Sequence, residues 1–270
     1  MVELNTKYKI GKRRFGLINW VGFYSLYQKE TLRFLIVFGQ TIAGPVLTGV
    51  LFLSVISLAW GDERDLVLGV PFIEFLAPGL ISMQVIQQAF SHSSSSILMS
   101  KVMGNIVDLI GSPLSSLEVT IAIILASVTR SILICIVCVV VFNFFVEIKI
   151  LNYLYFVIFL VLSSFFMGAL GFIAGIWAEK FDNMATVTNF IIVPLSFLSG
   201  TFYSIDKLPF FLEKLSFFNP FFHMIDGIRF SMIGLSDGSI LFGLYYLTTI
   251  SFLTWFIAFL LYKKGYKIKS

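Results

Sequence analysis

Ser199 comes closest to a catalytic nucleophile, since it stands in the run Leu198-Ser199-Gly200. A serine hydroxyl becomes a good nucleophile when a neighbouring base takes its proton. The chain has two histidines, His92 and His223, and His223 is the nearer of the two to Ser199 along the sequence. A serine hydrolase built on Ser199 and His223 is therefore a minor hypothesis.

His223 also begins a second pattern, because Asp226 and Arg229 follow it at intervals of three residues. On a helix this spacing places the three side chains roughly on one face. They could relay a proton, but an ion pair between Asp226 and Arg229 beside a polar histidine is the more ordinary structure. We expect the ion pair.

Cys135 and Cys138 form a C-x-x-C pattern inside an apolar run. Such a pair can bind a metal or do redox chemistry, but no second pair of Cys or His residues completes a zinc site. We interpret them as two small apolar residues one helical turn apart. The sequence has neither G-x-x-x-x-G-K-[ST] nor H-E-x-x-H, so the chain is not expected to bind ATP phosphates or a catalytic metal.

The composition places all of these residues in a membrane protein. Of the 270 residues, 58% are hydrophobic and 13% are charged, whereas soluble domains are about a quarter charged. The mean hydropathy is +0.94. These values exclude a disordered chain, a secreted disulfide scaffold and a cytosolic enzyme. An all-α polytopic membrane protein remains, in which the net charge of +4 is a topology signal.

Six apolar runs are long enough to cross a bilayer as helices, which takes about 20 residues each. The predicted spans are residues 34–58, 72–90, 119–146, 153–177, 185–203 and 240–262 of a single transmembrane domain, 1–270. Ser115 and Glu118 match a capping box that opens the third span, and Asn152 caps the fourth. Pro45 is expected to kink the first span.

Basic residues decide the predicted orientation. Seven of them precede the first span and four follow the last, in the tail 263–270, so both termini are expected in the cytoplasm. The loop at 59–71 then faces outward, with three acidic residues against one basic residue. The loop at 91–118 faces the cytoplasm.

Within the N-terminal region 1–33, residues 18–33 carry aromatic side chains at helical spacing opposite two bases. This pattern is typical of an amphipathic helix that lies in the cytoplasmic interface. Its key residues are Trp20, Tyr24, Tyr27, Lys29 and Arg33. A plain interfacial anchor and a coupling role are equally good interpretations.

The segment 204–239 is too long for a turn and too rich in phenylalanine for a solvated loop. Asn219-Pro220 reads as an N-cap followed by proline at the first helical position. We expect two re-entrant half-helices between the fifth and sixth spans, because the phenylalanines do not keep to one face. Two amphipathic helices lying flat on the membrane are the alternative.

The predicted spans hold no carboxylate near their middle, where ion-coupled transporters usually bind their ions. Arg130 is the only charge well inside a span, where it either snorkels or pairs with a neighbour. The energy source is therefore expected in a partner. The inner segment 101–114 is half apolar, with Val102, Ile106 and Leu109 on one side of a short helix. It suits docking of a soluble subunit, and an ordinary interfacial loop is the alternative.

Several stretches of the sequence occur in a characteristic order: 24–34 leading to Pro45, then 75–80, 105–114, 197–204, 215–220 and 226–230. Together with six spans, this order resembles the membrane permease subunits of type-2 ATP-binding-cassette (ABC) exporters. The resemblance is closest to the short bacterial permeases of the multidrug and lipopolymer type.

The resemblance implies three sets of site residues. The helix that couples the permease to its ATPase would use Lys101, Asn105, Ile106, Asp108, Leu109, Ser112 and Pro113. The outer gate would use Phe218, Asn219, Pro220, Asp226 and Arg229. The substrate pathway would be lined by Phe38, Phe52, Gln84 and Phe197.

The resemblance also implies an assembly of two permease copies, identical or different, with two soluble ABC ATPase subunits in a bacterial inner membrane. ATP and magnesium would bind to the ATPase, and this chain would hold no cofactor and no nucleic acid. The expected function is ATP-driven efflux of a lipophilic drug-like or lipid-linked substrate. An ion-coupled secondary transporter or channel is the alternative, and an intramembrane hydrolase is less favoured.

Overall fold

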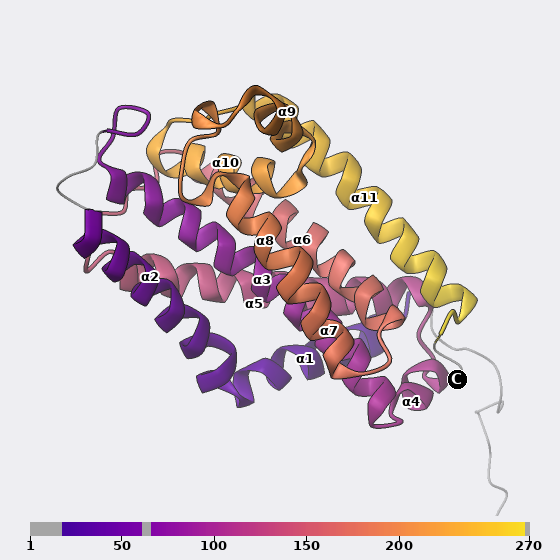
Figure 1. Cartoon of the computed structure of the whole chain (residues 1–270). Helices are drawn as coiled ribbons and strands as arrows, with labels where there is room; N and C mark the ends of the chain where they lie inside the picture. Colours follow the sequence, from indigo (N-terminus) through magenta and orange to yellow (C-terminus); the bar gives the residue numbers. More distant parts are fainter. Residues whose placement is uncertain (1–17, 61–65, 268–270) are drawn as a thin grey trace, which may run out of the picture.

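The computed structural model describes residues 18–60 and 66–267, and in this part of the chain the regular structure is helical (Figure 1). An isolated bridge between Val67 and Val70 is the one β-type pairing in these residues. Three groups of charges used in the topology prediction lie outside the described residues: the five bases up to Arg14, the charged turn at 61–65, and Lys269.

The helices follow one another along the chain with short connections. The α-helices are α1 Trp20–Ile36, α2 Gly44–Trp60, α3 Phe72–Val102, α4 Ile106–Gly111, α5 Ser116–Phe142, α6 Tyr153–Trp177, α7 Phe181–Val187, α8 Val193–Ser196, α9 Phe210–Phe218, α10 Pro220–Ile233 and α11 Ile240–Lys264. Three π-helical turns, η1 Gly39–Ala43, η2 Thr188–Ile192 and η3 Phe197–Thr201, and one 3-10 turn, η4 Ile205–Lys207, join them.

Five segments of the described chain are long and apolar enough to cross a membrane. They are Gly39–Ala59, Ser116–Phe142, Tyr153–Trp177, Phe181–Thr201 and Ile240–Lys264. The longest helix, α3, has 31 residues, but three glutamines and the serine cluster Ser93–Ser96 make it less apolar than the five. The structure therefore agrees with an all-helical protein that has five to six helices of membrane length.

Polar side chains set the helix starts that the sequence predicts. Ser115 and Glu118 form a capping box at the start of α5, in which each side chain accepts from the other residue's backbone N–H. Asn152 caps α6 through the N–H of Tyr155. Asn219 caps α10, with Pro220 at its first position. These three predictions are confirmed.

The first predicted span, 34–58, differs from the structure at its start. The helix α1 continues to Ile36, and a new helical segment begins with the π-turn η1. Pro45 accounts for the π-turn, because proline has no N–H to donate to Thr41 four residues earlier. The preceding residue, Gly44, shows the π-type pattern, because its N–H bonds to the carbonyl of Gly39, five residues back rather than four.

The predicted second span, 72–90, is too short. The helix α3 continues through the serine cluster to Val102, and only 103–105 and 112–115 of the expected loop 91–118 lie outside helices. Small residues explain this extension, because α6 packs directly against α3. A Cβ atom added to Gly171 would lie 2.3 Å from the carbonyl oxygen of Phe90, and one added to Gly175 would lie 2.8 Å from that of Ser94. The α5 and α7 helices also begin earlier than predicted, at Ser116 and Phe181.

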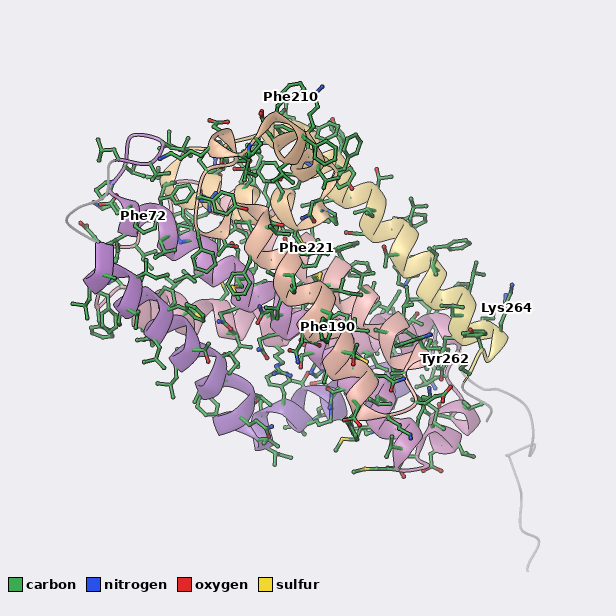
Figure 2. The ribbon with its side chains drawn as sticks, in the orientation of Figure 1. Phe72, Phe190, Phe210, Phe221, Tyr262 and Lys264 are labelled. Carbon is green, nitrogen blue, oxygen red and sulfur yellow. The ribbon has the colours of Figure 1, made fainter. Side chains whose placement is uncertain are left out.

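The helix α3 lies at the centre of the bundle, in contact with α2, α5, α6 and α10. Figure 1 shows α9 and α10 together at one end of the bundle, and α4 at the other end with α1 running across it. Side chains mark the same two ends, with Phe210 at the first and Lys264 at the second (Figure 2). We call these the outer end and the inner end, following the predicted orientation.

Candidate functional site

A groove of about 470 Å³ opens at the inner end between α1 and the segment that holds α4. The α1 wall consists of Gly22, Ser25, Leu26 and Lys29, and the opposite wall of Asn105, Asp108, Leu109, Ser112, Pro113 and Leu114. The floor is apolar, because Leu26 and Ile106 belong to one buried cluster that Leu109 covers. The structure thus brings two separately predicted elements, the interfacial helix and the coupling segment, to one site.

Two residues of the predicted coupling segment have other positions. Val102 does not share a face with Ile106, because it ends α3 and is 53% exposed while Ile106 is buried. Lys101 points away from the groove and donates to the carbonyls of Ile176 and Ala178 at 2.7 and 2.6 Å. It therefore neutralises the carboxyl end of α6, where unpaired carbonyls carry partial negative charge.

An ion pair lies beside this helix end. Lys267 donates to Glu179 at 3.0 Å and lies 6.0 Å from the ring of Trp177. The hydrogen bond and charge of Lys267 hold the pKa of Glu179 below its usual range. The inner ends of α3, α6 and α11 are thus tied by basic side chains.

The helix α1 is amphipathic, but its buried face differs from the predicted aromatic one. Leu26, Glu30 and Phe34 are buried, whereas Trp20 and Tyr24 are 67% and 62% exposed. Because these buried residues recur every four positions, they lie on one face, and a carboxylate at its centre needs polar partners.

Two further predicted residues of α1 make contacts with the bundle rather than with solvent. The hydroxyl of Tyr27 is 2.7 Å from that of Thr129 on α5. Arg33 does not lie on an exposed basic face with Lys29, because it donates to the carbonyl of His92 and to Ser95 on α3. Lys29 remains exposed and lines the groove.

The outer end is organised around α10, whose residues Phe221–Arg229 are all buried. Asn219 accepts from the N–H of Phe221 at 3.0 Å and donates to the hydroxyl of Ser199 at 2.8 Å. Asp226 accepts from the N–H groups of Asp237 and Gly238 at 2.8 and 3.0 Å. Phe218 is 76% exposed at the end of α9. The predicted gate residues are therefore neighbours with different exposures.

The predicted ion pair between Asp226 and Arg229 is replaced by another. Arg229 is fully buried and lies 3.6 Å from a carboxylate oxygen of Asp237. Its guanidinium donates to the carbonyl of Gly200 at 2.5 Å and lies 3.8 Å from the ring centroid of Phe75. Asp226 is occupied by the two backbone N–H groups of the α10–α11 loop, so loop geometry overrides helical spacing.

Gly79 and Gly200 allow the η3 segment to lie close to α3 and Arg229. A Cβ atom added to Gly79 would lie 2.5 Å from the carbonyl oxygen of Thr201 and 3.2 Å from Arg229. Gly200 has φ of +79°, a left-handed conformation that breaks the helix and is costly for other residues. The break at η3 can therefore approach α3 closely and present a carbonyl to Arg229.

Three aromatic rings meet between α2 and the η3 region. Phe52 lies 6.5 Å from Phe197 and 6.3 Å from Phe202, and the last two stack at 5.2 Å. Two of the predicted pathway residues are thus neighbours, and Phe202 joins them. Gln84 is buried in the bundle and Phe38 is 51% exposed at the junction of α1 and η1, so the four do not form one surface.

Comparison with known proteins decides the family. The ABC-2 type transporter family matches residues 17–233, a range that holds both walls of the groove and the whole of α10. The chain belongs to this family. The permease is therefore the membrane subunit of an ABC transporter, and such subunits work with a separate ABC ATPase and are not themselves enzymes.

Individual relatives agree with this assignment. The permease is 31% identical over 218 residues to the inner membrane transport permease YadH of Escherichia coli K12, which covers 81% of this chain and 85% of YadH. The YadH protein of Shigella flexneri matches equally. Nodulation protein J of Rhizobium leguminosarum bv. viciae is 33% identical over 66 residues, 24% of this chain and 26% of that protein.

The contacts of Ser199 and His223 agree with a permease rather than a hydrolase. The Ser199 hydroxyl donates to the carbonyl of Leu195 and accepts from Asn219, and His223 bonds through Nε2 to the carbonyl of Phe217 at 2.8 Å. The two side chains therefore have separate partners. Cys135 and Cys138 are both buried in the apolar core.

Arg130 pairs with neighbours rather than snorkelling. Its guanidinium donates to the side-chain oxygen of Gln88 on α3 at 2.5 Å and to the carbonyl of Thr41 at 3.2 Å. The π-turn η1 explains the second bond, because Pro45 leaves the Thr41 carbonyl without its usual helical donor. A single arginine thus joins α5 to α3 and to the π-turn η1.

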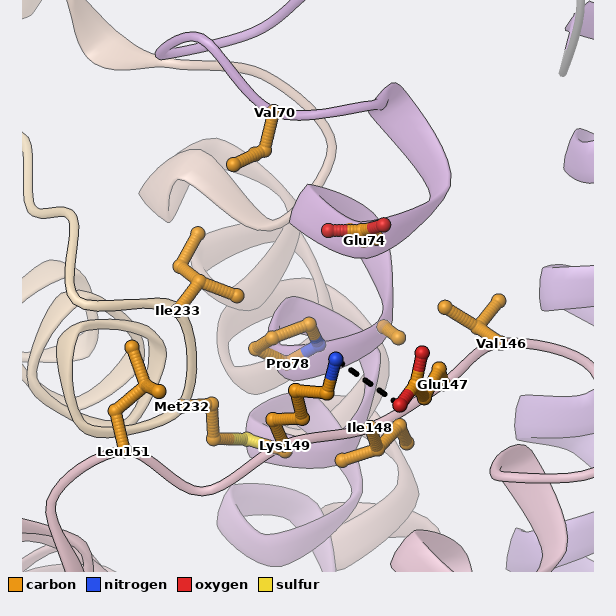
Figure 3. A pocket seen from close by; sticks show the side chains of 11 residues that line it. Val70, Glu74, Pro78, Val146, Glu147, Ile148, Lys149, Leu151, Met232 and Ile233 are labelled. Carbon is orange, nitrogen blue, oxygen red and sulfur yellow. Dashed lines mark ion pairs between the residues drawn. The ribbon is translucent and has the colours of Figure 1, made fainter.

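A smaller cavity of about 150 Å³ lies at the outer end, between the start of α3 and the end of α10 (Figure 3). Glu74 stands at one side of it. Lys149 and Glu147 stand opposite and form an ion pair at 3.0 Å. Pro78 and Met232 are among its apolar lining residues. Glu74 stands in the first turn of α3, at the end that we call outer.

Sequence reasoning missed the partners of Glu30. The bases Lys29 and Arg33 were assigned to a polar face, Glu30 was given no role, and the serine cluster Ser93–Ser96 was expected in the cytoplasmic loop 91–118. The signal available was a carboxylate at the centre of an apolar stripe, which requires buried donors. The structure supplies them from α3.

Proposed function

We propose that the permease pairs with a second permease copy to form the export pathway of an ATP-driven transporter in a bacterial inner membrane. The groove between α1 and α4 carries this proposal, because it offers an ATPase an apolar floor rimmed by Lys29 and Asp108. Non-obligate interfaces commonly have this arrangement of apolar core and polar rim. The names of the relatives YadH and nodulation protein J, an inner membrane permease and a nodulation protein, fit a bacterial membrane setting.

In this proposal the six spans are η1 with α2, α3, α5, α6, α7 through η3, and α11. The helix α1 lies in the cytoplasmic interface, and α9 and α10 re-enter from the outside. Burial supports re-entrance for α10, because a helix lying flat on a membrane keeps one polar face exposed. Lys263 and Lys264 lie at the same end as the groove, which supports a cytoplasmic C-terminal end.

The proposed mechanism transmits force through the groove. Binding of ATP and magnesium to the ATPase closes the ATPase dimer, which moves α4 and shifts the contact between the two permease copies. This requires the ATPase to bind two permease states with different affinity. The permease contributes the docking surface and the pathway.

A lipophilic or lipid-linked substrate suits the outer half of the molecule. A cavity of about 360 Å³ lies between η3 and α9, and half of its lining residues are leucines, such as Leu198, Leu212 and Leu215. Phe197 lies on the same helical segment as Leu198, and Phe52 of α2 packs against it in the aromatic cluster. Apolar walls with few polar groups favour apolar ligands.

Affinity purification in mild detergent tests the function. We expect a soluble ATPase with a P-loop motif to copurify at about one copy per permease. Asp108→Lys should abolish this copurification, because it reverses the charge of an exposed groove residue. Leu109→Pro should do the same, because it removes the N–H that bonds to the carbonyl of Asn105 within α4. Asp182→Lys, an equal change at an exposed acid of α7 outside the groove, is the matched control.

The outcomes separate clearly. Loss of the ATPase with Asp108→Lys and its retention with Asp182→Lys would establish the groove as the docking site, provided both variants insert normally into the membrane. A wild-type permease that purifies alone and shows no ATP-dependent activity would refute the proposed function. Retention of the ATPase in every variant would show that the docking site lies outside the groove.

A further inference from the structure

Two buried carboxylates fasten the two ends of α1, the helix that forms one wall of the groove. Glu118 of α5, which is 2% exposed, contacts the start of α1, and Glu30, which is 3% exposed, is part of α1 near its end. A buried carboxylate is costly unless charged or hydrogen-bonded partners compensate it. Each of these has such partners on another segment of the chain.

The first fastening joins α1 to the start of α5. One oxygen of Glu118 accepts from the backbone N–H of Asn19 at 2.6 Å, and the other accepts from that of Ser115 at 2.5 Å. The side chain of Asn19 also donates to the carbonyl of Pro113 at 3.3 Å. This end of α1 therefore moves with the α4–α5 connection.

The second fastening joins α1 to the C-terminal third of α3. One oxygen of Glu30 accepts from the hydroxyl of Ser96 at 2.8 Å and from the guanidinium of Arg33 at 3.0 Å. Arg33 in turn donates to the carbonyl of His92 at 3.1 Å and to Ser95 at 3.4 Å. Charge-assisted hydrogen bonds of this kind are roughly twice as strong as neutral ones.

The fastening on α3 matters because the helix backbones do not supply it. The backbone of α1 packs chiefly against α5, so α1 reaches α3 through long side chains, with the ring of Phe34 against His92 as the apolar part. The helix α3 is the centre of the bundle and runs to the outer end. This link is the direct path by which a movement of the α1 wall reaches α3.

We propose that Glu30 is a positioning residue that makes α1 and α3 move as one body, so that displacement of the groove wall by an ATPase is passed to α3. The inference rests on the proposed function for the source of the force. Glu30 does not line the groove, so it acts through Ser96 and Arg33 rather than by touching the partner.

The test measures the distance between α1 and the outer end of α3 with spin labels at Gln28→Cys and Glu74→Cys, both exposed positions. Labelled chains are diluted with unlabelled ones so that only distances within one chain count. The full-length permease is measured alone, and then with the copurified ATPase, without nucleotide and with a non-hydrolysable ATP analogue.

With Glu30 intact we expect one narrow distance that is the same in all states. Glu30→Gln and Ser96→Ala should each broaden the distribution in the permease alone and shift it when the analogue binds. The double variant should broaden and shift the distance distribution no more than either single variant does, because both substitutions remove the same link. Ser100→Ala is the matched control, since this hydroxyl bonds only within α3, to the carbonyl of Ser96.

A purely structural role would lower expression or thermal stability without making the distance depend on nucleotide. An unchanged narrow distance in both Glu30→Gln and Ser96→Ala would overturn the proposal, as would a nucleotide-dependent shift in the unsubstituted chain. Absence of any copurifying ATPase would count against the proposed function alone, because the width measured without a partner still tests the link.

Discussion

Arg229 shows how much one side chain decides at the residue scale. It is fully buried, and it contacts three elements at once through Gly200, Asp237 and the ring of Phe75. A planar guanidinium can donate in several directions and stack on a ring, which a lysine cannot do. We conclude that Arg229 holds α10 against the break at η3 and the outer half of α3.

Arg229→Met should destabilise the permease strongly. Removing one partner of a buried ion pair typically costs about 3–5 kcal/mol, because the other charge is left without compensation. The measurement is the thermal unfolding midpoint in detergent. Lys149→Gln is the matched control, because its ion pair with Glu147 is 67% and 75% exposed and such pairs contribute about 0–1 kcal/mol. Equal midpoints for the two variants would contradict the role given to Arg229.

The contact between α3 and α6 is the main packing feature at the element scale. Membrane helices associate closely where small residues let their backbones approach, since lipid offers no hydrophobic driving force between them. Gly171 and Gly175 provide that approach on α6, where they meet the backbone of Phe90 and Ser94 on α3. The close approach keeps the serine cluster helical to Val102, so the inner end of α3 leads directly into α4.

Gly171→Ala tests this packing. The added methyl group would lie 2.3 Å from the backbone oxygen of Phe90, so the helices must separate, at a cost of about 1–3 kcal/mol for overpacking. Gly39→Ala adds the same methyl group where no atom lies within 4 Å and should leave the thermal midpoint unchanged or raised. A midpoint for Gly171→Ala equal to that of Gly39→Ala would argue against the close contact.

At the scale of the whole molecule, the two ends differ in chemistry. The inner end carries the groove, the ion pair of Glu179 with Lys267, and Lys263 and Lys264. The outer end carries the buried α10 and the exposed aromatic face of α9. A conformational change at one end is therefore passed to the other through helices that run the full length, of which α3 is the most central.

Cysteine labelling in intact spheroplasts tests this orientation. A membrane-impermeant maleimide should label Lys214→Cys, on an exposed site of α9, and should label Lys264→Cys only after the membrane is permeabilised. The native Cys135 and Cys138 are buried, so the unsubstituted chain gives the background. The reverse pattern would invert the topology, and labelling of both sites before permeabilisation would contradict the six-span arrangement.

The sequence by itself determined the features that depend on contiguous residues. Apolar runs specify membrane helices because the backbone must bond internally in lipid, and local caps at Ser115, Asn152 and Asn219 set where helices begin. The order of these stretches also identified the family. Helical spacing alone was wrong for Asp226 and Arg229, because it could not weigh a partner brought in by a loop.

Only the tertiary structure decided the long-range partners. Glu30 meets Ser96, Arg130 meets Thr41, and Asn19 meets Glu118, across separations of 66, 89 and 99 residues. No short-range pattern encodes such pairs, because they depend on which faces of which helices pack together. The same packing brings α1 to α4, and so the groove exists only in the folded chain, although both of its walls can be recognised in the sequence.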